Sequence, residues 1–479
     1  MGRADYLYNG FISNLKFEPT RSQDSFFRTA ADFLCGDDDD ILVVNGYAGT
    51  GKTTAVSSII RTLGELKIKT VLLAPTGRAA KVLSGYAGRA ASTVHKHIYR
   101  QKAVSGDGFG EFSLNQNKDR DTLFVVDEVS LIGIDSSAGN TTAAFGTGNL
   151  LEDLIAFMRK GVDCKMILVG DSAQLPPVGM DCSPALSREY MAMMGGTIFC
   201  QITDVVRQQK ASGILENATR LRQMIAGDDY GSYTPDELGL VTRDFEDVQR
   251  IGGGDLIETL SDAYSRYGED ETVILCRSNK RAIKYNLGVR ATVQFKEEAL
   301  VRGDKLMIVK NCYQFCEKIE GLDYIANGDI AKLLKISDYE ERYGLHFATA
   351  RLSLPDYDDQ ELTAKVILDT LQSESASLTY EQQNALYIGV DADYSHIASK
   401  KKRWQAVRED KYYNALQLKY AEALTCHKSQ GGQWKCVFID NPFWQDELVT
   451  EDLKWLYTAL TRAVGKVYLV NFKDEFFAE

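Results

Sequence analysis

The stretch GYAGTGKTT, residues 46–54, has the residue types and spacing of a phosphate-binding loop. An apolar run at 41–44 predicts a buried strand before it, and helical spacing follows it. Glycines let backbone N–H groups close around a β-phosphate, and the N-terminus of a helix favours an anion there. The lysine would reach the β- and γ-phosphates, and the next threonine would offer its hydroxyl to Mg²⁺. The residues predicted to bind the nucleotide are Gly46, Ala48, Gly49, Thr50, Gly51, Lys52, Thr53 and Thr54.

Acidic residues follow a second apolar run, at 123–126. Asp127 fits the role of holding Mg²⁺ and its water shell, and Glu128 fits the base that orients the attacking water. A third apolar run leads into GDSAQLPPV, which contains Gln174. Ligands lie at the carboxyl ends of parallel strands, so these strand ends should meet at one site. We expect Gln174 to approach the γ-phosphate; the alternative is a rigid turn at the two prolines, without a sensing role.

Small hydroxyls and basic side chains follow two further predicted strands. VLLAPTGRAAKVL contains Pro75, Thr76 and Arg78, and ASTVHKHI contains Thr93 and His95. Such side chains suit contacts with a phosphate backbone, because these contacts need hydrogen-bond donors rather than readers of bases. The HKH sequence could suggest a metal, but no acidic or cysteine partner stands at ligand spacing. We therefore predict nucleic-acid contacts here.

The order of these motifs resembles that of the superfamily 1 helicases. Further along the chain, ITDVVRQ, ILCRSNKRA, TCHKSQGG and YTALTRA continue the series, so that nine motifs fall in order between about residues 17 and 470. The resemblance is closest to the RecD and Dda group, superfamily 1B. It implies ATP and Mg²⁺ as cofactors, bound between two core domains that close around the γ-phosphate.

The resemblance also implies roles for three residues outside the motifs above. FEPTRSQDSFF looks like the Q motif, so Gln23 would contact the adenine edge; a surface helix glutamine is the alternative. Arg207 and Arg462 resemble the two arginines that reach across the interdomain cleft to the γ-phosphate. A guanidinium there neutralises charge that develops on the transferred phosphoryl group. Either arginine could instead form a structural ion pair.

The predicted fold class is α/β, with two RecA-like P-loop domains. The first covers 1–205 and contains an inserted pin hairpin at 98–121. The second has its first part at 206–294 and its last part at 415–479. Between these parts, short strands at 295–414 predict an inserted small β-rich domain, SH3-like by resemblance.

The hairpin has Gly-Asp-Gly punctuation and aromatic residues. In the resembling helicases a hairpin in this place splits the duplex, and Phe109 or Phe112 would stack on the last base pair. A polar loop without this role is the alternative. The insert at 135–149 has no assigned function, and the basic run SKKKRW suits either a DNA contact or a solvated helix face.

The stretch ALTCHKSQGGQWKCVFID, residues 423–440, has more polar side chains than a turn requires. We expect Thr425 and His427 to touch the DNA backbone. Gln430 and the backbone of Gly431 would face the nucleotide, and the paired glycines would let the backbone approach closely. The loop is therefore predicted to couple the two ligands.

Composition limits the remaining classes. The net charge of −12 argues against binding of nucleic acid by bulk positive charge, but not against a locally basic channel. The nine cysteines are scattered singly, which favours reduced, buried thiols over a metal cluster. Without an apolar run near the ~20 residues of a membrane span or a secretory signal, we expect a cytoplasmic protein, nucleoid-associated or phage-encoded.

The function expected from these observations is that of an ATP-dependent DNA helicase. It would translocate on single-stranded DNA and unwind forked duplexes as a monomer, with 5′-to-3′ polarity taken only from the resemblance. Single-strand-binding or replication and recombination proteins would be its partners. One alternative is a DNA-stimulated P-loop ATPase that remodels nucleoprotein without unwinding; another is a passive DNA-binding subunit, which the intact ATPase residues disfavour.

Overall fold

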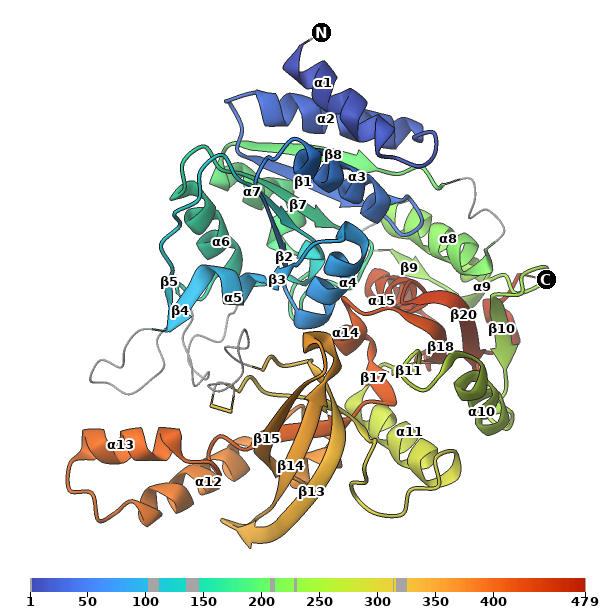
Figure 1. The fold of residues 1–479 in the computed structure, drawn as a ribbon. Coiled ribbons are helices and arrows are strands. Elements are labelled where there is room, and N and C mark those ends of the chain that lie inside the picture. The colour runs from blue at the N-terminus through green and yellow to red at the C-terminus, as the bar shows by residue number, and fades with distance from the viewer. Residues whose placement is uncertain are drawn as a thin grey trace.

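The computed structural model describes residues 2–101, 112–134, 146–206, 212–227, 231–312, 314–315 and 325–478. Two parallel sheets and a closed barrel organise these ranges (Figure 1). The prediction of an α/β chain with parallel sheets is confirmed. No helix in the described ranges combines the length and the apolarity needed to cross a bilayer.

The first sheet has six parallel strands whose inner members are buried on both faces. Their order is β3 (Ser92–Thr93), β2 (Thr70–Ala74), β6 (Leu123–Val126), β7 (Lys165–Gly170), β1 (Ile41–Gly46) and β8 (Thr197–Ile202). The apolar runs read from the sequence form β1, β6 and β7, because a strand covered on both faces needs continuous apolar residues. The carboxyl ends of β1, β2, β6 and β7 therefore lie along one edge.

Two sets of helices cover this sheet. Leu42 and Val44 of β1 pack with one set, and Ile41 and Val43 pack with the other, as the alternation of a strand requires. The first set is α1 (Arg3–Ser13), α2 (Arg21–Cys35), α3 (Lys52–Glu65) and α4 (Gly77–Ala87), largely in dark blue in Figure 1. The second set is α5 (Val94–Ile98), α6 (Leu150–Arg159) and α7 (Arg188–Met194).

The second sheet has five parallel strands. Their order is β10 (Val248–Ile251), β20 (Ala463–Val470), β18 (Trp434–Asp440), β11 (Thr272–Cys276) and β17 (Ala423–Thr425). One face packs with α10 (Leu256–Tyr267) and α11 (Asn279–Thr292), and the other packs with α8 (Gly213–Gly227) and α15 (Thr450–Leu460). Short elements border it: β9 (Ser232–Tyr233), α9 (Pro235–Leu238), α14 (Cys426–Ser429) and β19 (Leu448–Val449).

The inserted β-rich segment forms a closed five-stranded barrel, and two helices follow its fourth strand (Figure 1). The strands are β12 (Lys305–Ile308), β13 (Ile330–Arg342), β14 (Leu345–Leu354), β15 (Gln360–Ile367) and β16 (Leu416–Tyr420), and the helices are α12 (Tyr380–Asp393) and α13 (Lys400–Glu409). The predicted limit at 414 is too early, because β16 closes the barrel. The chain passes from β16 to β17 with only residues 421–422 between them, so the sequence contains no turn signal there.

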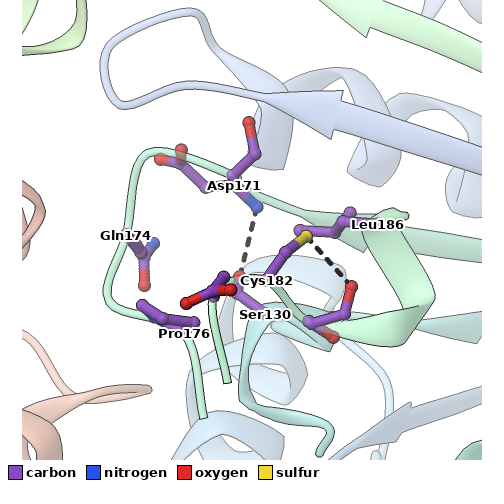
Figure 2. Close-up of a pocket in the computed structure, with 9 residues that line it drawn as sticks. Ser130, Asp171, Gln174, Pro176, Cys182 and Leu186 are labelled. Atoms are coloured by element: carbon purple, nitrogen blue, oxygen red, sulfur yellow. Dashed lines mark hydrogen bonds between the residues drawn. The ribbon is translucent and has the colours of Figure 1, made fainter. Parts of the chain in front are cut away.

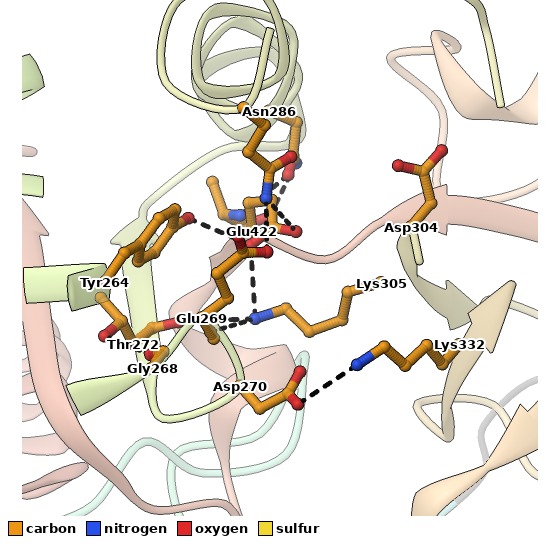
Figure 3. Close-up of polar contacts among 12 residues, drawn as sticks. Tyr264, Gly268, Glu269, Asp270, Thr272, Asn286, Asp304, Lys305, Lys332 and Glu422 are labelled. Atoms are coloured by element: carbon orange, nitrogen blue, oxygen red, sulfur yellow. Dashed lines mark hydrogen bonds and ion pairs between the residues drawn. The ribbon is translucent and has the colours of Figure 1, made fainter. Parts of the chain in front are cut away.

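Polar contacts join the barrel to the second sheet (Figure 3). Lys305 Nζ on β12 donates to the Glu269 carbonyl at 2.9 Å and lies 3.4 Å from Glu422 Oε2. The Tyr264 hydroxyl donates to the same carboxylate oxygen at 3.1 Å. Both side chains of the Lys305–Glu422 pair are nearly buried, so removing one partner would leave an uncompensated charge. These contacts fix one edge of the barrel to the second sheet.

The hairpin predicted at 98–121 has a paired base. β4 (Tyr99–Gln101) and β5 (Phe112–Leu114) run antiparallel, with Tyr99 opposite Leu114. Residues 102–111, including Phe109, lie outside the described residues. The role of a pin therefore stays a prediction.

Candidate nucleotide site and nucleic-acid interface

The phosphate-binding loop connects β1 to α3. Gly49 has φ 73° and Gly51 has φ 70°, in the left-handed region that favours glycine. A Cβ built on Gly49 would lie 2.1 Å from Leu215 Cδ1, so the loop also needs glycine for space. Lys52 is the first residue of α3, and its Nζ donates to the Gly170 carbonyl at 3.3 Å. The loop is thus shaped as the motif predicts, with Lys52 beside the end of β7.

Asp127 and Glu128 lie at the end of β6. One oxygen of the buried Asp127 accepts from the Glu128 N–H at 2.8 Å, and the other accepts from the Tyr86 hydroxyl. Burial raises the pKa of Asp127 and the neighbouring Glu128 charge raises it further, whereas Lys52 lowers it. Tyr86 is a residue that the sequence did not suggest, because no motif includes it.

Gln174 lies in the loop after β7, beside a small pocket that also contains Asp171 and Ser130 (Figure 2). The Asp171 N–H donates to Ser130 Oγ at 3.2 Å, which ties this loop to the turn after Glu128. The prediction that the three strand ends meet is therefore confirmed by the sheet order and by this contact. The rest of the pocket is lined by Ser172, Pro176, Asp181, Cys182, Ser183 and Leu186.

Two buried oxygens indicate that these residues fit a bound polar group. Glu128 Oε2 and Gln174 Oε1 have no hydrogen-bond partner in the described part of the chain, although buried polar atoms are normally paired. Carboxylate and hydroxyl oxygens of Asp127 and Thr53 are the hard donors that Mg²⁺ prefers. Together with Lys52, this donor set fits a nucleotide with Mg²⁺.

The loop after β7 is also held by the second sheet's elements. The Leu175 N–H donates to Thr458 Oγ1 of α15 at 2.8 Å, and Gln430 Nε2 donates to the Leu175 carbonyl at 2.7 Å. The Tyr457 hydroxyl donates to Asp171 Oδ2 at 2.6 Å. Gln430 thus contacts the loop that carries Gln174, whereas a direct contact with the nucleotide stays a prediction. Tyr457 and Thr458 were not predicted from the sequence, because only the arginine of YTALTRA has an evident chemical role.

Five of the residues predicted to contact DNA lie near the start of α4 or of α5: Pro75, Thr76, Arg78, Thr93 and His95. Thr76 and Thr93 cap these helices by accepting from backbone N–H groups at 3.2 and 3.3 Å. The Arg78 guanidinium lies 3.9 Å from the centre of the Trp434 ring. A Cβ on Gly431 would lie 3.1 Å from Thr76 Oγ1, so the glycine pair approaches α4 closely. The structure brings Thr76, Arg78 and Gly431 together, with Pro75 preceding Thr76.

The two candidate histidines are held neutral by their surroundings. Burial lowers the pKa of His95 to about 4 and also lowers the pKa of His427. Either ring could donate to a phosphate only as a neutral imidazole at neutral pH. Thr425 precedes α14, where Lys428 Nζ donates to Asn327 Oδ1 of the barrel at 2.7 Å. The loop therefore contacts the barrel as well as the first sheet's elements.

Comparisons with known proteins agree with this arrangement. Residues 25–229 match the model of an AAA domain, and residues 420–470 match the UvrD-like helicase C-terminal domain. The ATP-dependent DNA helicase Dda of Enterobacteria phage T4 is 24% identical and aligns over 90% of this chain and 94% of its own length. The chain is similar to superfamily 1B helicases of the RecD and Dda group. The ATP-dependent RecD2 DNA helicase of Deinococcus radiodurans is 32% identical over 37% of this chain.

Two of the relatives are longer than this chain. The chain spans 36% of an uncharacterized protein of Methanocaldococcus jannaschii, at 22% identity, and 21% of RecD2. A crystal structure of Bacteroides Pif1 helicase with ADP-AlF3 and single-stranded DNA aligns over 96% of this chain and 95% of its own, with TM-score 0.47 and 17% identity.

The superfamily 1B resemblance selected Gln23, which is fully buried at the phosphate-binding loop. Its Nε2 donates to the Thr50 carbonyl at 2.8 Å, and its Oε1 accepts from the Thr20 N–H at 3.0 Å. The alternative of a surface glutamine is wrong. The adenine contact stays a prediction, since both ends of the amide already bind backbone.

We call the first sheet with its helices the first unit and the second sheet with its helices the second unit. Arg462 of the second unit is buried, with 3% of its surface exposed. Its guanidinium donates to the Gly432 carbonyl at 3.3 Å, the Thr458 carbonyl at 3.2 Å and Thr461 Oγ1 at 3.3 Å. All three partners belong to its own unit, so contact with a γ-phosphate stays a prediction. Arg207 lies outside the described residues.

Proposed function

We propose that the chain is an ATP-dependent DNA helicase that uses Mg²⁺, translocates on single-stranded DNA and separates forked duplexes. The observation that carries the proposal is the double contact at Leu175. Both its backbone groups are bound by the second unit, at 2.8 Å by Thr458 and at 2.7 Å by Gln430. Leu175 follows Gln174 in the chain. A movement of Gln174 in response to the γ-phosphate would therefore be transmitted through Leu175 to the second unit.

The relatives support the same activity. Dda and RecD2 are both named ATP-dependent DNA helicases, and Dda aligns over nearly its whole length. We extend the proposal to the domains: two RecA-like units around the two sheets, an SH3-like barrel, and a pin at the β4–β5 hairpin. Polarity of 5′-to-3′, monomeric action in the cytoplasm and partners among replication or recombination proteins belong to the proposal as well.

The test uses the purified full chain with Mg²⁺ and ATP. Hydrolysis is measured with and without single-stranded DNA, and strand separation is measured on duplexes with either a 5′ or a 3′ tail. We expect DNA to stimulate hydrolysis and only the 5′-tailed duplex to separate. Stimulated hydrolysis without separation of either duplex would favour a nucleoprotein-remodelling ATPase, and separation of only the 3′-tailed duplex would reverse the polarity.

A further inference from the structure

Tyr457 of α15 lies wholly between the two units, with 1% of its surface exposed. Its hydroxyl donates to Asp171 Oδ2 at 2.6 Å and accepts from the Ala48 N–H of the phosphate-binding loop at 2.8 Å. One atom thus joins the nucleotide loop, the end of β7 and the helix that leads to Arg462. No motif role inherited from the resemblance uses this atom.

The Tyr457 hydroxyl provides hydrogen bonds to polar groups that are buried in apolar surroundings. Leu175 and Ala173 pack in the same apolar cluster as Tyr457, and Ala48 packs against it. A buried carboxylate is costly unless hydrogen-bonded, and Asp171 otherwise accepts from the Ala173 N–H at 3.0 Å. A phenylalanine would keep the shape of the ring but remove one bond from Asp171 and one from Ala48.

We propose that Tyr457 is a positioning residue for ATP hydrolysis. Its hydroxyl seats α15, and with it Arg462, against the phosphate-binding loop and the loop after β7. The inference rests on the proposed function, because the reaction that it positions is ATP hydrolysis. Since Tyr457 need not touch the nucleotide, its loss should affect turnover more than nucleotide binding.

The test is Tyr457→Phe in the full chain. We expect kcat of DNA-stimulated hydrolysis to fall about tenfold, because the hydrogen bonds of the hydroxyl with the buried Asp171 and with Ala48 of the phosphate-binding loop are lost. KM for ATP and the affinity for a fluorescent ADP analogue should stay within about twofold. The matched control is Tyr264→Phe, which removes a hydroxyl bonded to Glu422 away from the nucleotide loop and should leave kcat unchanged.

A second variant approaches the same bond from the other unit. Asp171→Ala removes one of the two partners of the Tyr457 hydroxyl, so the double variant with Tyr457→Phe should lose less turnover than the two single losses combined, because both single variants remove the Tyr457–Asp171 bond. Additive losses, an unchanged kcat in Tyr457→Phe, or a loss confined to KM would each overturn the inference while wild-type hydrolysis upholds the proposed function. A wild-type chain without DNA-stimulated hydrolysis would overturn both.

Discussion

At the scale of single residues, Lys52 interacts with two neighbouring residues, Gly170 and Asp127. It donates to the Gly170 carbonyl at the end of β7, and its charge lowers the pKa of Asp127 against the effect of burial. Burying a carboxylate without a cation is unfavourable, so Lys52 helps to keep Asp127 ionised for a metal. The same ammonium is the group that the motif directs to the β- and γ-phosphates.

Lys52→Ala should reduce ATP hydrolysis by roughly a hundredfold or more, because a preorganised charge at the reacting phosphate is removed. Single-stranded DNA binding should be retained, since no predicted DNA contact involves this side chain. Hydrolysis and DNA affinity are measured on the same preparation. Near-normal turnover would refute the assignment of the site.

His95 gives a prediction about acid stability. Its pKa is about 4 in the folded chain because of burial, and it returns to an ordinary value near 6.5 on unfolding. Between these values the unfolded state binds the proton and the folded state does not, so stability falls as the pH drops from 6.5 towards 4. In His95→Gln, urea unfolding should show a shallower loss of stability across this range, and an identical pH slope would contradict the prediction.

Residues with a local motif were predictable, and residues defined by distant partners were not. Lys52, Asp127 and Gln174 stand at strand ends in short patterns whose chemistry is readable. Tyr86 is 41 residues from its partner Asp127, and Tyr457 is 409 residues from Ala48. Such pairs depend on how distant parts of the chain pack, within the first unit for Tyr86 and between the two units for Tyr457, which local spacing does not encode.

At the scale of elements, the loop after β7 is hydrogen-bonded to residues of both units. Its start is bound by Ser130 of the first unit, and Leu175 is bound by Thr458 and Gln430 of the second. The apolar runs that form β1, β6 and β7 were readable because both faces of these strands are buried. The end of the barrel was not, because β16 leads almost directly into β17.

Gln430→Ala should lower the number of base pairs separated per ATP hydrolysed by several-fold, while DNA-stimulated hydrolysis continues. The variant removes the 2.7 Å bond to the Leu175 carbonyl, which links the loop at 423–440 to the loop that carries Gln174. Gln433→Ala is the matched control, since Gln433 is exposed in the same stretch. Unchanged coupling in Gln430→Ala would leave this loop with a structural role alone.

At the scale of the whole molecule, the barrel touches both units. Lys81 of α4 donates to the Pro355 carbonyl of the barrel, and the Tyr357 hydroxyl would lie 2.7 Å from a Cβ on Gly77. Lys305 of the barrel pairs with Glu422 next to the second sheet. The barrel therefore bridges α4, where Thr76 and Arg78 lie, to the second unit, and movement between the units would change these contacts.

The predicted role of the β4–β5 hairpin as a pin can be tested separately from ATP hydrolysis. Replacing residues 103–110 by Asn-Gly keeps Gln101 opposite Phe112 and closes the strands with a two-residue turn. DNA-stimulated hydrolysis should persist, because the nucleotide site is untouched. Separation of forked duplexes should fall about tenfold, since aromatic stacking on a base contributes ~1–3 kcal/mol.

The comparison that decides the role of the hairpin is between unwinding and translocation. The shortened chain should still displace streptavidin from the end of biotinylated single-stranded DNA at the wild-type rate, because that reaction requires movement but no strand separation. A matched Phe112→Ala variant of the full-length hairpin distinguishes a role for this aromatic ring from a role for the tip. Wild-type unwinding by the shortened chain would show that the tip is dispensable and that strand separation depends on other parts of the molecule.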